Sequence, residues 1–195
     1  MAPRVTKTEH LIKDAARRIF LVEGKLHATT ADIAKEAGIP RTSLHYYFRS
    51  RDVLFKVVFE DAVKDLTGQI KEVIESPNQF RNKIETIIKV LTEASLRYPY
   101  LETFVVTEII SQKLDVPTRN AGIKWQVFLK EVKAEMDLGR IELMDPLHFV
   151  LNLFSMIVYP AIAAPLYTKL FSVSERQYRE ILRERQSIIL LQIFK

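Results

Sequence analysis

Hydrophobic residues recur every three or four positions along nearly the whole chain, and runs that alternate residue by residue are sparse. This spacing is typical of helices with one apolar face, so the sequence predicts an all-α fold. Glycine and proline residues end or open most of the predicted segments. The expected helices cover residues 7–22, two short segments within 29–48, then 50–75, 79–97, 100–113, 118–138, a segment that begins at 146, and 174–193.

The stretch at residues 29–48, TTADIAKEAGIPRTSLHYYF, combines start and stop signals for two short helices. Thr29 is placed to cap the first helix, with Asp32 three residues later as the answering carboxylate. Gly38 supplies the positive φ that ends a helix, and Pro40 is suited to open the next one. Two short helices around such a tight turn predict a helix-turn-helix.

The second of these helices has two distinct faces. Leu44 and Phe48 stand four residues apart and are expected to point inward. The side chains expected on the other face are those of Arg41, Thr42, His45 and Tyr46. A turn that only joins two core helices is the alternative, but a buried helix would not place three ring-bearing side chains together at 45–47. The pattern therefore favours a recognition helix for the DNA major groove.

Extended to residue 54, this stretch resembles the DNA-binding signature of the tetracycline-repressor (TetR) family of bacterial transcription regulators. The matching features are Thr29, the Asp-Ile-Ala core of residues 32–34, Ala37-Gly38, Leu44, the aromatic group that ends at Phe48, and the run from Ser50 to Leu54. His45 departs from the family pattern, which has tyrosine there, so base preference does not carry over. The resemblance implies a DNA-binding domain over residues 6–66 and an effector-binding and dimerisation domain over residues 67–195.

The resemblance also implies roles for individual side chains. Arg41, Thr42 and His45 match positions that contact base edges, where arginine can form paired hydrogen bonds with guanine and a threonine methyl can contact thymine. The positions that match phosphate contacts are Thr30, Ser43, Tyr46, Tyr47 and Arg51. Such contacts fix the register and carry little sequence information. Ala31 stands where some members have a base-reading basic residue, so specificity is expected to lie in the second helix.

The charge distribution suits a polyanionic partner. The formal net charge is +5, and the basic excess is concentrated around the predicted recognition helix. Between residues 35 and 56 the basic side chains are Lys35, Arg41, Arg49, Arg51 and Lys56, against the acidic Glu36 and Asp52. Such a local excess, interleaved with aromatic residues, is what binding to the phosphates of double-stranded DNA requires.

Catalytic chemistry is not indicated. The chain has no cysteine, which excludes disulfides, thiolate nucleophiles and cysteine-based zinc sites. Its four histidines form no HExxH pair, and its five glycines stand singly and build no phosphate-binding loop. We therefore expect no enzymatic activity, no metal and no cofactor. The N-terminal residues contain no apolar signal segment, which fits a protein of the cytoplasm.

Residues 146–168 contain no Asp, Glu, Lys or Arg over 23 positions. That length can cross a bilayer, but polar residues and prolines interrupt the segment and no basic cluster flanks it. A helix that is apolar all round can also be buried between partners or in a monomer core. In the TetR family the last two helices pair with their copies, so we expect a homodimer and no membrane span. The expected interface combines the helix from 146 to about 166 with Ile181, Leu182, Ile188 and Ile189.

An apolar effector pocket is expected between the helices of the second domain. Its candidate lining residues are Ile88, Phe104, Glu108, Trp125, Phe128, Met156 and Tyr159. Ordinary core packing is the alternative for each of them. Glu108 is an isolated acid on an otherwise apolar helix face, so in a cavity it would favour a cationic or hydroxyl-bearing effector.

Together these observations predict a homodimeric DNA-binding transcription regulator. The resemblance implies a repressor that a small, largely apolar effector releases from a palindromic operator, and the residues themselves do not distinguish repression from activation. The rival interpretation is a helical small-molecule-binding or interaction module with a vestigial helix-turn-helix. The joint occurrence of Tyr46, Tyr47 and Arg51 argues against this rival, because a module without DNA has no reason to expose them together.

Overall fold

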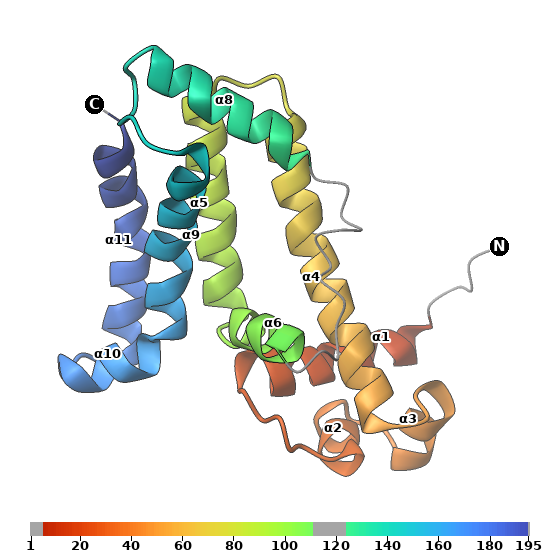
Figure 1. The fold of residues 1–195 in the computed structure, drawn as a ribbon. Helices are drawn as coiled ribbons and strands as arrows, with labels where there is room; N and C mark the ends of the chain where they lie inside the picture. Colours follow the sequence, from red (N-terminus) through yellow and green to blue (C-terminus); the bar gives the residue numbers. More distant parts are fainter. Residues whose placement is uncertain (1–5, 111–123, 195) are drawn as a thin grey trace.

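The computed structural model describes residues 6–110 and 124–194 and confirms the all-α fold class (Figure 1). Among these residues the only β-type pairing is an isolated bridge between Ile141 and Phe194. The predicted helical positions 111–113 and 118–123 lie outside the described residues. The helices are α1 (Lys7–Arg17, continued by a π-helical turn over Arg18–Val22), α2 (Thr30–Glu36), α3 (Arg41–Tyr47), α4 (Arg51–Glu75), α5 (Phe80–Arg97), α6 (Leu101–Ile110), α8 (Trp125–Asp137), α9 (Pro146–Ile162), α10 (Ala164–Leu170) and α11 (Glu175–Ile193).

Side chains cap three of the longer helices. At the start of α4, the Ser50 hydroxyl accepts a hydrogen bond from the Val53 N–H at 3.2 Å. At the start of α9, the Asp145 carboxylate accepts one from the Leu147 N–H at 2.7 Å. Ser174 begins α11 with a reciprocal capping box. These bonds satisfy N–H groups that the first turn of a helix leaves unpaired, which explains why the helices begin where they do.

The predicted apolar helix from 146 to about 166 is interrupted, which corrects the expectation from sequence. α9 ends at Ile162, and α10 begins at Ala164, with 66° between the two helices. The cause is Pro165, which has no N–H to continue the helical hydrogen bonds and whose ring clashes with the preceding turn. Among the described helices, none is by itself long and apolar enough to cross a membrane, and only the bent α9–α10 pair reaches that length and composition.

A second proline, Pro160, lies inside α9 and leaves a gap in its hydrogen bonds. Because proline has no N–H, the Met156 carbonyl has no helical partner four residues later. Arg185 of α11 donates from Nη2 to this carbonyl at 3.1 Å. The Tyr178 hydroxyl likewise donates to the Pro160 carbonyl at 2.8 Å, and burial raises the pKa of this hydroxyl. Side chains of α11 therefore fasten it to α9 where α9 is irregular.

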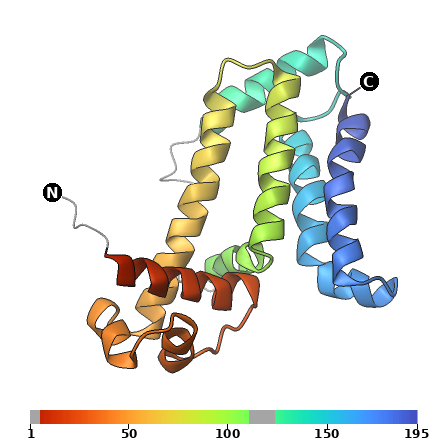
Figure 2. The same cartoon turned by 180° about the vertical axis from the view of Figure 1, so that it is seen from behind.

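Helix α4 runs from the end of the molecule that carries α2 and α3 to the end that carries α8 (Figure 1; Figure 2), and two hydrophobic clusters lie along it. The 25 residues of α4 span about 37 Å at ~1.5 Å per residue. Its first half packs with α1, α2 and α3 in what we call the N-terminal cluster. Its second half belongs with α5, α8, α9 and α11 to the C-terminal cluster. Leu66 contacts both clusters, and the domain boundary at residue 66 stays a prediction.

Helix α6 follows the boundary in sequence but packs into the N-terminal cluster. Leu101 and Phe104 are buried there, and the Phe104 ring meets the Phe55 ring edge to face, with centroids 5.9 Å apart. Tyr100, just before α6, donates its N–H to the Leu21 carbonyl at 3.2 Å. The N-terminal cluster is thus attached to the rest of the molecule by both α4 and α6.

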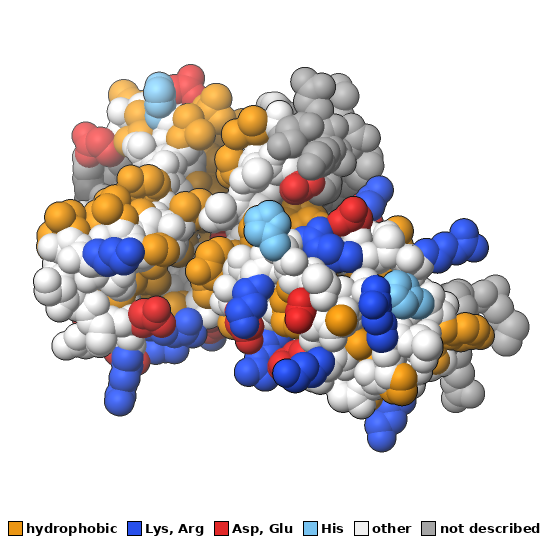
Figure 3. All heavy atoms as spheres, turned by 90° about the horizontal axis from the view of Figure 1, so that it is seen from below, with side chains coloured by type: hydrophobic (Ala, Val, Ile, Leu, Met, Phe, Trp, Pro, Cys, Tyr) orange, Lys and Arg blue, Asp and Glu red, His pale blue; other side chains and the backbone are white. Residues whose placement is uncertain are grey.

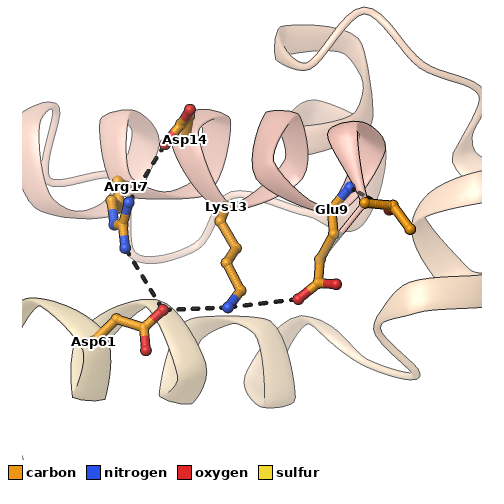
Figure 4. A network of polar contacts seen from close by, with 6 residues as sticks. Glu9, Lys13, Asp14, Arg17 and Asp61 are labelled. Atoms are coloured by element: carbon orange, nitrogen blue, oxygen red, sulfur yellow. Dashed lines mark hydrogen bonds and ion pairs between the residues drawn. The ribbon is translucent and has the colours of Figure 1, made fainter. Parts of the chain in front are cut away.

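Ion pairs also hold α1 against α4 (Figure 4). The Asp61 carboxylate of α4 lies 3.3 Å from Lys13 Nζ and 3.5 Å from Arg17 Nη2. Within α1, Lys13 also pairs with Glu9, and Arg17 pairs with Asp14. Partly exposed pairs of this kind each contribute about 1 kcal/mol at most. Their main effect is to fix how α1 crosses the beginning of α4.

Candidate DNA-binding interface

The turn between α2 and α3 has the predicted geometry. The Asp32 N–H donates to the Thr29 hydroxyl at 3.2 Å, and the Thr29 N–H donates to the Asp32 carboxylate at 2.7 Å, which lowers the pKa of Asp32. Gly38 follows α2 with φ +66°, a left-handed conformation that glycine adopts without steric cost. Pro40 is the N-cap of α3 rather than its first residue. The helix-turn-helix predicted at 29–48 is therefore present.

Helix α3 divides its side chains between core and solvent as predicted. Leu44 is completely buried and Phe48 is nearly so, and both belong to the N-terminal cluster. The exposed side chains are those of Arg41, Thr42, His45 and Tyr46. Tyr46 is 84% exposed, which is unusual for an aromatic side chain with no binding role. A short helix firmly seated on the core thus presents a polar and aromatic face to solvent.

The outward side chains of α3 also contact one another. Arg41 donates from Nε to Nε2 of His45 at 3.3 Å, one helical turn away. The terminal nitrogens of Arg41 make no hydrogen bond or ion pair within the described residues. The Tyr46 and Tyr47 rings meet edge to face with centroids 5.3 Å apart, and Tyr47 packs against the N-terminal cluster. This arrangement leaves the donors of Arg41 and the Tyr46 ring available to a partner.

Basic side chains gather over the N-terminal domain on the side that carries α2 and α3 (Figure 3). Lys35, Arg49 and Lys56, which belong to the predicted basic stretch, are exposed. Lys56 pairs with Glu60 at 3.7 Å, and this pair is open to solvent. The predicted local excess of positive charge is therefore on the surface, where it can attract phosphates over a Debye length of ~8 Å at physiological salt.

Arg51, predicted to contact phosphate, has several partners inside the protein. Its Nε donates to the Ala28 carbonyl at 3.1 Å, and its Nη1 donates to Asp52 at 2.6 Å. Its guanidinium carbon lies 5.2 Å from the centre of the Phe20 ring, a cation–π distance. Arg51 therefore ties the start of α4 to the segment before α2. A contact with phosphate through its remaining donors stays a prediction.

Thr30 and Ser43 also expose little of their side chains. Thr30 is the first residue of α2 and is 8% exposed, and Ser43 is half-buried in the first turn of α3. Both residues lie near the exposed face of α3, but their side chains expose little surface through which to contact a phosphate. These two assignments also stay predictions.

Comparison with known proteins identifies the class of this domain. Residues 12–58, which run from α1 into α4, match the sequence profile of the family described as bacterial regulatory proteins, tetR family. The nucleoid occlusion factor SlmA of Vibrio cholerae is 24% identical over 98 residues, which is 50% of each chain. The HTH-type transcriptional regulator BetI of Brucella canis is 32% identical over 77 residues, 40% of this chain and 39% of BetI. The chain thus spans about half the length, or less, of the curated relatives it matches.

Solved structures extend the similarity of fold to nearly the whole chain. A crystal structure of a linker-substituted HlyIIR mutant protein has a TM-score of 0.64 at 18% identity and covers 96% of this chain and 97% of that one. A TetR family transcription regulator from Marinobacter aquaeolei VT8 has a TM-score of 0.58 at 16% identity, with 96% of each chain covered. At these identities the structures show a common fold. The sequence similarity to the tetR family of bacterial regulatory proteins therefore covers residues 12–58, and nearly the whole chain shares the fold of these solved structures.

The seven residues predicted to line an effector pocket do not meet in one place. Those in or against the C-terminal cluster are Ile88, Trp125, Phe128 and Met156. Phe104 lies instead in the N-terminal cluster, Glu108 is half-buried on α6, and Tyr159 is 56% exposed beside Tyr167. Helical periodicity identified apolar faces correctly but gave no information about which helices they pack against. The single pocket expected from this set is not formed.

A different cleft, of about 480 Å³, lies between the end of α1, the α5–α6 junction and α9–α11. None of the seven predicted residues lines it. Its polar residues include Ser95 and Arg179, which occupy ordinary positions in amphipathic helices and gave no signal in the sequence. Only the packing of separate helices brings them together.

Proposed function

We propose that the protein is a homodimeric, DNA-binding transcription regulator of the cytoplasm rather than an enzyme. The observation that supports this most strongly is the exposed face of α3, held outward by the buried side chains of Leu44 and Phe48. A seated helix with a polar and aromatic outer face, surrounded by basic residues, suits the major groove of double-stranded DNA.

Three side chains are proposed to read bases. Arg41 has free terminal nitrogens that suit the O6 and N7 acceptors of guanine, and the bond from its Nε to His45 supports the proposal that the two side chains act on neighbouring bases. Thr42 is exposed beside them and offers a methyl group to thymine. The proposed phosphate contacts are those of Thr30, Ser43, Tyr46, Tyr47 and Arg51, which would fix the register of α3 in the groove.

A homodimer is proposed from the apolar surface of the last helices. The exposed large hydrophobic residues of α9, α11 and the α10 region include Leu147, Leu151, Leu166, Leu170, Phe171, Ile181, Ile188 and Leu191. Of the interface residues expected from sequence, Ile181 and Ile188 are exposed, whereas Leu182 and Ile189 are buried within the protomer, which corrects their assignment. A patch of this kind marks a protein interface, and a two-fold dimer would present two α3 helices to a palindromic operator.

Repression and release by a small effector complete the proposal. Both α4 and α6 join the N-terminal cluster to the helices that carry the proposed dimer surface. An effector that binds one arrangement of these helices more tightly would shift the population of dimers. Dimers whose α3 helices are not about 34 Å apart cannot enter two successive major grooves, so they would leave the operator.

The proposal is tested by measuring binding to a random-sequence DNA duplex as a function of salt, together with sedimentation of the free protein. We expect a species of twice the 22.7 kDa chain mass and an affinity that falls steeply as salt rises. The variant Arg41→Ala, His45→Ala should keep the sedimentation behaviour and lose preference among sequences. A monomer, or the absence of salt-dependent DNA binding, would instead support the helical module with a vestigial helix-turn-helix.

A further inference from the structure

The cleft beside α6 has the size and lining of a small-molecule site. Its volume of about 480 Å³ lies within the ~300–1,000 Å³ typical of ligand pockets. Its wall is largely apolar and includes Val22, Leu96, Tyr100, Ile162 and Leu182. From below, a hollow lined with hydrophobic side chains separates the region of α10 from the N-terminal domain (Figure 3).

One part of the cleft adjoins a second, much smaller void, and we call this part the inner end of the cleft. Ser95 lines the cleft and also a small void of about 10 Å³ behind it, and Ala161 and Leu182 belong to both linings. A void of this size holds about one water molecule. Arg185, from α11, therefore lines a void that adjoins the cleft at Ser95, Ala161 and Leu182.

Arg185 has a donor that the protein does not use. Its Nη2 donates to the Met156 carbonyl, but its Nε is buried and has no hydrogen-bond partner. Within the described residues Arg185 forms no ion pair. Arg179, which lines the cleft, donates to the Leu96 carbonyl at 2.9 Å and also forms no ion pair there. A buried donor without an acceptor is costly, so these two arginines favour an anionic ligand.

Glu102 of α6 is a half-buried acid whose carboxylate contacts Ser95 of the cleft lining. The Ser95 hydroxyl lies 3.0 Å from the Leu91 carbonyl and 2.7 Å from Glu102 Oε1. Ser95 has one hydroxyl proton, and if the proton goes to the Leu91 carbonyl, then Glu102 must be the donor and carry a proton itself. Burial raises the pKa of Glu102, which favours the same neutral form. When Glu102 is protonated, Arg179 and Arg185 are the charged groups that remain beside the inner end of the cleft.

The acids at the rim of the cleft do not change this balance. Glu23 is already paired with Lys25 at 2.8 Å and with Arg18 at 3.2 Å. Glu175, also part of the lining, is exposed to solvent, where its charge is screened. The apolar wall and the positive inner end together define the chemistry of the ligand.

We propose that this cleft binds an apolar molecule with a carboxylate end, held by Ser95 and Arg185 at the inner end while the apolar part lies along the wall. The carboxylate would accept a hydrogen bond from the unused Nε–H of Arg185 and occupy the water-sized void. Leu182 would move to let the carboxylate enter. An ammonium end would instead face two arginines. That this ligand acts as the effector of a regulator rests on the proposed function. Its binding to the cleft can be measured without DNA.

Occupancy of the cleft would affect both halves of the molecule. One wall is formed by Tyr100 and Thr103, next to the residues of α6 that are buried in the N-terminal cluster. The opposite wall is formed by α9–α11, which carry the proposed dimer surface. A ligand between these walls would therefore change the spacing of the two α3 helices in the dimer.

Calorimetric titration of the full chain with decanoate, decanol and decylammonium tests the inference. Decanoate should bind, and decanol and decylammonium should bind about tenfold more weakly or worse, because they lack a charge-assisted bond to arginine. Arg185→Gln should weaken the binding of decanoate by a similar factor. Arg183→Gln, on the same helix but exposed and paired with Glu180, is the matched control and should bind normally. Thr103→Trp, which fills the cleft without changing charge, should abolish binding even if Arg185→Gln does not fold.

Equal binding of decanol and decanoate, preference for decylammonium, or normal decanoate binding by Thr103→Trp would each overturn the inference. A parallel measurement of DNA binding separates the two proposals. Decanoate binding without DNA binding would leave the cleft assignment standing and remove the proposed function. DNA binding without decanoate binding would do the reverse.

Discussion

The helix-turn-helix and the cleft beside α6 were built in different ways. Every feature of the helix-turn-helix comes from residues close together in the sequence: the Thr29 capping box, the φ of Gly38 and the alternation of buried and exposed positions on α3. The cleft is assembled from four separate segments between residues 22 and 182. A surface made by one short segment can be found from its pattern, whereas a cavity between distant segments cannot.

The two regions also differ in how their polar groups are satisfied. The outward side chains of α3 are solvated in the free protein, so they carry no desolvation penalty when DNA is absent. In the cleft region, Arg185 Nε and Glu102 Oε2 are buried without hydrogen-bond partners. Each such atom lowers the stability of the free protein until a ligand or a water molecule pairs with it. We therefore expect ligand binding to raise the melting temperature.

The largest expected effect is on the core beneath α3. Leu44→Ala removes a completely buried side chain and should destabilise the protein by about 2–5 kcal/mol, with loss of DNA binding as a consequence. Leu11→Ala, at a position that is 43% exposed, should change stability by about 0.5 kcal/mol or little more. Chemical denaturation of both variants checks the comparison, and equal effects would mean that α3 is not seated as described.

A glycine series tests the attachment of α6 to the N-terminal cluster. At Gly24, φ is +65° and a Cβ would lie 2.6 Å from the Tyr100 ring, so Gly24→Ala should cost about 1–3 kcal/mol. Gly38→Ala meets no atom within 4 Å and should cost only the ~1–2 kcal/mol of its left-handed backbone. Gly68→Ala, inside α4 and without a close neighbour, should stabilise by about 0.5–1 kcal/mol. Thermal unfolding that ranked Gly38→Ala as worse than Gly24→Ala would contradict the contact with Tyr100.

These positions show how far the sequence predicts the molecule. Helix positions, caps and the inward side chains of α3 follow from local patterns, and most of them are present among the described residues. The break after Ile162 was missed, although Pro165 was visible, because the apolar run continued across it. Arg51 shows a further limit. Its position was singled out for phosphate, but only packing shows that most of its guanidinium is used within the protein.

Substitutions on α3 and α4 separate base reading from support. Arg41→Ala and His45→Ala should each cost about 1–3 kcal/mol on the preferred operator and relax preference at one base pair. Arg51→Ala should weaken binding to every sequence by a similar factor and reduce the salt slope by about 0.9 per half-site if one phosphate contact is lost. It should also lower stability, since it removes the bond to Ala28. Loss of base preference in Arg51→Ala, with preference unchanged in the other two, would invert the proposed roles.

The smallest expected effect concerns Glu102, the half-buried acid that contacts Ser95 of the cleft lining. Burial raises the pKa of Glu102 in the folded state. The contribution of this carboxyl to the free energy of unfolding is therefore fully present below the unfolded pKa of about 4.3, and it is lost as pH rises through the folded pKa. Glu102→Gln keeps a donor for Ser95 and cannot ionise. The melting temperature of Glu102→Gln should therefore rise relative to that of the wild type as pH increases from about 4 to about 8. Glu93→Gln, an exposed site on α5, should show no such trend, and parallel curves for Glu102→Gln and the wild type would contradict the burial of the Glu102 carboxyl.

The central claim is that the exposed face of α3 reads DNA from a two-fold dimer. Its most direct test is selection of bound sequences from a random duplex pool with the wild type and with Arg41→Ala, His45→Ala. The wild type should enrich a palindrome whose half-sites are centred about 10 base pairs, or a multiple of one helical turn, apart. The double variant should enrich nothing while it retains salt-dependent binding to bulk DNA. Enrichment of the same palindrome by the double variant, or no enrichment by the wild type, would contradict the account.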